Sequence, residues 1–65
     1  MPIELDILRT ANLLIRQHGT DAELAAAMKA DEMLAAGDID GQRVWLRVMK
    51  AIQQLQDLSK PDRVH

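Results

Sequence analysis

The chain has 65 residues, a formal net charge of −2 at pH 7 and a pI of about 5.5. It contains no cysteine, which excludes disulfide bridges and thiolate metal sites and fits a cytoplasmic protein. The acidic balance gives no general attraction to nucleic acid or anionic lipid, and no apolar run approaches the ~18 residues that span a bilayer. We therefore expect one helical domain over residues 1–60, stabilised by apolar packing, followed by a disordered tail at 61–65.

The first predicted element is a helix over about residues 3–17. His18 falls in its last turn, where a cation favours the negative end of the helix dipole. Gly19 follows as the left-handed residue that commonly ends a helix. The apolar side chains recur at helical spacing and are expected to face the core: Ile7, Leu8, Ala11, Leu14 and Ile15.

The second predicted helix covers about residues 21–36 and ends at Gly37. Thr20 and Glu23 have the spacing of a capping box, in which a hydroxyl and a carboxylate satisfy backbone amides at the helix start. The segment holds seven of the nine alanines, which favour helix formation and allow neighbouring helices to approach closely. Because its larger apolar side chains are spread around it, we expect this helix to be the central one.

The third predicted helix covers about residues 39–58, with Asp38 or Asp40 as its N-cap. Pro61 pushes the preceding residue out of the helical region and so predicts the helix end. Short connections make consecutive helices antiparallel neighbours. The fold class is therefore all-α, a compact three-helix bundle with short loops. The core arc expected for the third helix comprises Val44, Trp45, Val48, Met49, Ile52 and Leu55.

About two thirds of the chain, from Leu14 to Leu55, carries a recurring combination of His-Gly, Gly-Asp-x-x-Gly and Trp. On these residues the chain resembles a family of short, uncharacterised proteobacterial proteins, a domain of unknown function. The resemblance implies a compact helical fold in a bacterial cytoplasm and brings no known activity. The resembling residues are Leu14, Ile15, His18, Gly19, Ala30, Asp31, Gly37, Asp38, Gly41, Trp45, Ala51, Ile52 and Leu55.

The motifs that would carry chemistry are incomplete. Asp38-x-Asp40-Gly41 resembles the start of a calcium loop, but Arg43 stands where that loop needs glycine and Met49 replaces its closing glutamate. One histidine in the helices with scattered carboxylates does not make a zinc site, which needs three or four ligands. No serine or threonine has a histidine–acid pair at a meaningful spacing. We therefore predict no enzyme activity, catalytic residues, metal or cofactor.

Asp31 stands inside the apolar arc of the second helix, which comprises Leu24, Ala27, Met28, Leu34 and Ala35. A carboxylate that faces a core has to be paired or hydrogen-bonded. Arg9 or Arg16 and the indole N–H of Trp45 are the candidate partners. Asp31 and Trp45 are therefore predicted to form a buried polar anchor. A small-molecule site beside them is a hypothesis that ranks below the two described next.

Two leucines lie outside the sides of the helices that are predicted to face the core. Leu13 lies between Arg9 and Arg16, and Leu46 lies beside Lys50. Exposed leucines on so small a chain favour a protein partner or a homodimer. Our leading hypothesis is a non-enzymatic protein–protein interaction module.

The alternative is a small nucleic-acid-associated regulator. It would use a basic stripe on the third helix, formed by Arg43, Arg47 and Lys50. Against a DNA-reading helix-turn-helix, Glu32, Asp38 and Arg43 stand where that motif needs apolar residues. We therefore do not expect nucleic acid as the partner.

Overall fold

The computed structural model describes residues 4–59, and within this range the chain is helical except for a short connection at residues 36–38. The elements are α1 (Glu4–His18), a single 3-10 turn η1 (Gly19–Asp21), α2 (Ala22–Ala35) and α3 (Ile39–Ser59). The predicted all-helical class is confirmed, and each described helix end lies within one residue of its predicted position. The tail predicted at residues 61–65 lies outside the described residues.

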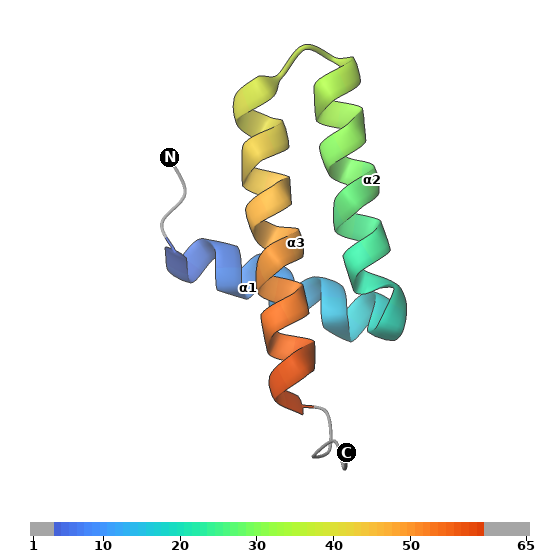
Figure 1. Ribbon diagram of the computed structural model, residues 1–65, viewed down its shortest axis with the longest axis vertical. Coiled ribbons are helices and arrows are strands. Elements are labelled where there is room, and N and C mark those ends of the chain that lie inside the picture. Colours follow the sequence, from blue (N-terminus) through green and yellow to red (C-terminus); the bar gives the residue numbers. More distant parts are fainter. Residues whose placement is uncertain (1–3, 60–65) are drawn as a thin grey trace, which may run out of the picture.

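The arrangement of the helices differs from the expected bundle of three antiparallel neighbours. Helices α2 and α3 form an antiparallel hairpin, and α1 lies across this hairpin instead of running alongside it (Figure 1). Both α1 and α2 have their larger interface with α3. The expectation that the second helix is central is therefore wrong, because α3 is the helix that the other two share.

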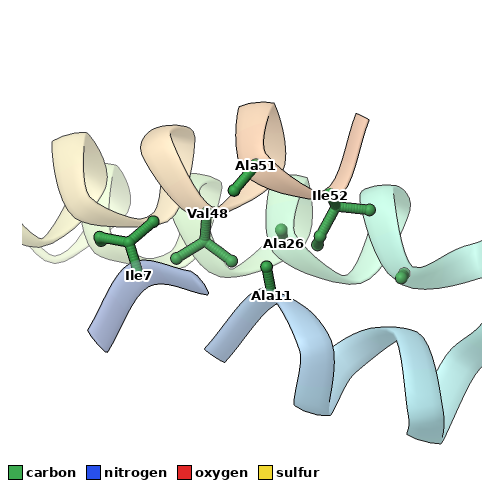
Figure 2. Close-up of a cluster of buried hydrophobic side chains, with 7 residues drawn as sticks. Ile7, Ala11, Ala26, Val48, Ala51 and Ile52 are labelled. Carbon is green, nitrogen blue, oxygen red and sulfur yellow. The ribbon is translucent and has the colours of Figure 1, made fainter. Parts of the chain in front are cut away.

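The core lies where the three helices meet. Val48 and Ile52 of α3 are its largest fully buried side chains, and Ile7 of α1 lies beside them (Figure 2). Ala11 of α1 is fully buried as well, and the remaining residues predicted to face the core from the first and third helices are partly buried around this centre. They are Leu8, Leu14, Ile15, Val44, Trp45, Met49 and Leu55.

Helix α2 contributes only alanines to the fully buried part of the core. Ala22, Ala26 and Ala30 follow one another at four-residue intervals, so they form one stripe along the helix. Their small side chains let the α2 backbone approach α1 and α3 closely, while the larger side chains of those two helices fill the space between.

The connection between α2 and α3 is closed by backbone hydrogen bonds around Gly37. The Gly37 amide donates to the carbonyl of Leu34 (3.0 Å) and the Asp38 amide donates to the carbonyl of Met33 (2.8 Å). This pair of bonds is the Schellman arrangement, and it requires a left-handed residue. Gly37 has a φ of 80°, so glycine is the residue that adopts it without strain.

Asp38 is the N-cap of α3, which the sequence predicted to be either Asp38 or Asp40. The Gly41 amide donates a hydrogen bond of 2.8 Å to Oδ1 of Asp38. A Cβ atom at Gly41 would lie 2.6 Å from Oδ2 of Asp38, so the missing side chain leaves room for the capping carboxylate. The connection therefore ends one helix and starts the next within three residues.

The predicted capping box at the start of α2 is wrong. Thr20 lies inside η1, Asp21 occupies the N-cap position, and no side-chain cap bond is formed there. Gly19 has a φ of 58°, which confirms its predicted left-handed conformation. Its carbonyl accepts a hydrogen bond of 2.9 Å from Nε2 of Gln56, which links the α1–α2 junction to α3.

Replacing the capping carboxylate tests this account of the connection. Asp38→Ala should lower the free energy of unfolding by about 1 kcal/mol, because an amide at the start of α3 loses its acceptor. Asp38→Asn keeps a side-chain oxygen at the same place and should retain most of the stability. Chemical denaturation measures both variants, and equal losses in the two would show that the charge, and not the hydrogen bond, matters.

Candidate functional site

The most unusual surface of the protein is the side of α2 that faces away from the core. Leu24, Met28, Asp31 and Ala35 are all exposed and lie four, three and four residues apart, so they form one stripe along the helix. We call these four residues the α2 outer stripe. Leu24 is 60% exposed and Met28 57%, which is unusual for large apolar side chains one turn apart.

The orientation of α2 contradicts the predicted burial of Asp31. The arc that contains Leu24, Met28 and Leu34 was expected to face the core, but all three side chains are exposed. Asp31 is exposed with them, and the described residues include no buried charged side chain. The carboxylate lies within an apolar surface, where water solvates it and no buried partner is required.

Trp45, the other half of the predicted anchor, differs from Asp31 in its surroundings. Its side chain is half-buried and packs against the core cluster from α3. Among residues 4–59, no hydrogen bond or salt bridge joins Asp31 to Trp45, Arg9 or Arg16. The structure therefore does not bring the anchor together, and the small-molecule site proposed beside it loses its basis.

The outward side of α1 carries the first of the two predicted exposed leucines. Leu13 is 51% exposed, as expected. Arg9, Asn12, Leu13 and Arg16 line an open hollow of about 530 Å³ on this helix. Arginine and asparagine side chains give this hollow a polar, positively charged lining.

The outward side of α3 carries the second exposed leucine and most of the predicted basic stripe. Ile39, Arg43, Leu46 and Lys50 are all exposed and lie four, three and four residues apart. We call these four residues the α3 outer stripe. Leu46 is 40% exposed, so its predicted exposure is confirmed. Apolar and basic side chains alternate along the stripe.

Arg47 is engaged elsewhere. Its Nη2 atom lies 2.9 Å from Oε2 of Glu4 in an exposed salt bridge that joins α3 to the first turn of α1. This ion pair leaves Arg43 and Lys50 as the outward basic groups of the predicted stripe. An exposed pair of this kind contributes only about 0–1 kcal/mol to stability, so its main effect here is on the surface charge.

Metal-binding clusters and membrane-spanning helices are both absent from residues 4–59. No group of three or more histidine, cysteine, aspartate or glutamate side chains is placed there to hold a metal ion. None of the described helices is both long and apolar enough to cross a membrane.

The exposure of Asp31 predicts that its carboxylate contributes little to folding. Asp31→Ala should change the free energy of unfolding by no more than about 0.5 kcal/mol, because no buried contact is lost. Ile52→Val, which removes one methyl group from the centre of the core, should cost about 0.5–1.5 kcal/mol as the matched comparison. A larger loss for Asp31→Ala than for Ile52→Val would restore the buried anchor.

Comparisons with known proteins do not add to this description. No family model matches the sequence, and no curated protein or solved structure is significantly similar to it. The resemblance to the uncharacterised bacterial family therefore stays a prediction, and the functional argument depends on the surfaces themselves.

Proposed function

We propose that the protein is a non-enzymatic helical interaction module that binds a protein surface through the outward side chains of its helices. The observation that carries the proposal is the α2 outer stripe, in which Leu24 and Met28 are exposed while alanines occupy the buried side of the same helix. Apolar side chains that are left on the surface in contiguous stripes are typical of interfaces. The cytoplasmic setting and the bacterial origin belong to the same proposal.

The composition of the stripe supports a protein partner in particular. An interface needs a well-packed apolar centre with polar groups at its edge. Leu24 and Met28 supply such a centre, and the Lys29–Glu32 ion pair lies on the flank of the same helix. Leu13 and Leu46 add exposed apolar side chains on α1 and α3, so more than one face of the protein is suited to contacts.

The alternative, a nucleic-acid-associated regulator, has less support. Phosphate binding requires a concentrated basic surface, because each contact contributes mainly through its charge. Arg47 is paired with Glu4, and Asp40 lies in the first turn of α3 near Arg43. The two outward basic groups left on α3, on a chain of net charge −2, give only a weak electrostatic attraction for phosphate.

A charge-matched pair of variants tests the proposed function. Leu24→Glu combined with Met28→Glu should abolish the complex that the chain forms in its own cells, because two carboxylates would have to be desolvated at the interface. Lys29→Glu changes the net charge by the same amount on the same helix, outside the outer stripe, and should leave the complex in place. Size-exclusion chromatography of lysates containing the tagged chain at native level measures both.

The stability of the purified variants provides the necessary control. Leu24 and Met28 are exposed and glutamate favours helix formation, so the double variant should unfold within about 1 kcal/mol of the original protein. A chain that elutes as a 7.3 kDa monomer both in lysates and when purified, with a double variant that supports growth normally, would refute the proposal.

A further inference from the structure

We infer that the α2 outer stripe binds the α3 outer stripe of a second copy of this chain, with the two helices antiparallel and Asp31 opposite Arg43. The inference rests on the proposed function and deepens it by naming the partner surface. Three observations on the described residues carry it: the matching spacing of the two stripes, their opposite charges, and the poorer match of the α1 surface.

The spacing of the two stripes matches when the helices run in opposite directions. Each stripe has intervals of four, three and four residues, which is the spacing of one face in helices that pack at a shallow angle. In this alignment the Met28 side chain falls opposite Leu46. One turn beyond Asp31, Ala35 falls opposite Ile39. The apolar side chains of one stripe therefore meet those of the other.

The same alignment pairs the charges. Asp31, the only charged residue of the α2 outer stripe, falls opposite Arg43. At the far end Leu24 falls opposite Lys50, whose aliphatic stem can cover the leucine while the ammonium group reaches solvent. The wider surroundings of Asp31 are also negative, because α2 carries three acidic side chains against one lysine.

The hollow on α1 is the competing partner, because Arg9 and Arg16 are also basic. When Arg9 is placed opposite Asp31 in an antiparallel alignment, the polar Asn12 falls opposite Met28. The other arginine, Arg16, then falls opposite Leu24. The apolar centre of the α2 outer stripe would face polar groups, so α3 is the better match.

Every copy presents both stripes of the proposed contact. Helix α1 lies across both helices of the hairpin (Figure 1), so the outer stripes lie on the sides of α2 and α3 that are directed away from this shared core. Each contact joins two different stripes, one from each copy, and the mass of the assembly in solution shows how many copies it links.

Disulfide trapping tests the pairing directly, because the chain has no cysteine of its own. Two single variants, Met28→Cys and Leu46→Cys, are mixed and oxidised mildly. The mixture should form the mixed dimer far more efficiently than either variant forms a dimer with itself, since only facing residues bring their Cα atoms within about 7 Å. Met28→Cys mixed with Leu13→Cys is the matched control for the α1 surface.

A charge exchange provides the second measurement. Asp31→Arg alone and Arg43→Asp alone should each weaken self-association by about tenfold or more, because like charges then face each other. The chain that carries both substitutions should associate with itself as strongly as the original protein, because opposite charges face each other again. Sedimentation velocity should show a mass that rises with concentration above that of the monomer.

Each other outcome overturns the inference. A disulfide between two copies of the Met28→Cys variant would assign a symmetric α2 dimer. A disulfide between the Met28→Cys and Leu13→Cys variants would assign the α1 surface. A monomer at all concentrations, with no trapped pair, would exclude a second copy as the partner. If the Leu24→Glu/Met28→Glu double variant still loses its complex in cells, the proposed function stands with a different protein as partner.

Discussion

The close packing of α2 through its alanines is the constraint on which the rest of the structure depends. Ala22, Ala26 and Ala30 allow the helix to approach its neighbours, and the larger side chains of the core then come from α1 and α3. A helix has only one side to bury in so small a protein. Once the alanines occupy that side, Leu24 and Met28 have to face outward, and the outward surface becomes apolar.

The division of apolar side chains between the core and the surface links folding stability to partner binding. The described core contains only three large buried side chains, Ile7, Val48 and Ile52, together with alanines. A domain of this size retains little stability from one core, typically about 3–5 kcal/mol. Covering the outer stripes in a complex would add apolar burial that the isolated chain lacks, so partner binding and folding stability would be coupled.

Much of the fold could be predicted from the sequence. The helix ends followed from Gly19, Gly37 and Asp38, because left-handed glycines and capping aspartates act locally. The predicted core faces of the first and third helices were correct, because each of these helices has a single apolar side.

The second helix has apolar residues on both sides, so periodicity could not decide which side is buried, and Asp31 was placed wrongly. The crossing of α1 and the Arg47–Glu4 pair depend on the tertiary arrangement, which local patterns do not encode. The signal that was available was the run of alanines at four-residue intervals, which marks a close helix contact.

The central claim is that the side of α2 containing Met28 faces outward and is covered when the protein assembles. The rate of methionine oxidation by dilute peroxide, followed by mass spectrometry of peptides, measures this most directly, because sulfoxide formation follows exposure. Met28 is exposed, whereas Met33 and Met49 are half-buried. In dilute solution Met28 should oxidise fastest of the three, and its rate alone should fall as the protein concentration rises. Slower oxidation of Met28 than of Met33 and Met49 in dilute solution would contradict the account.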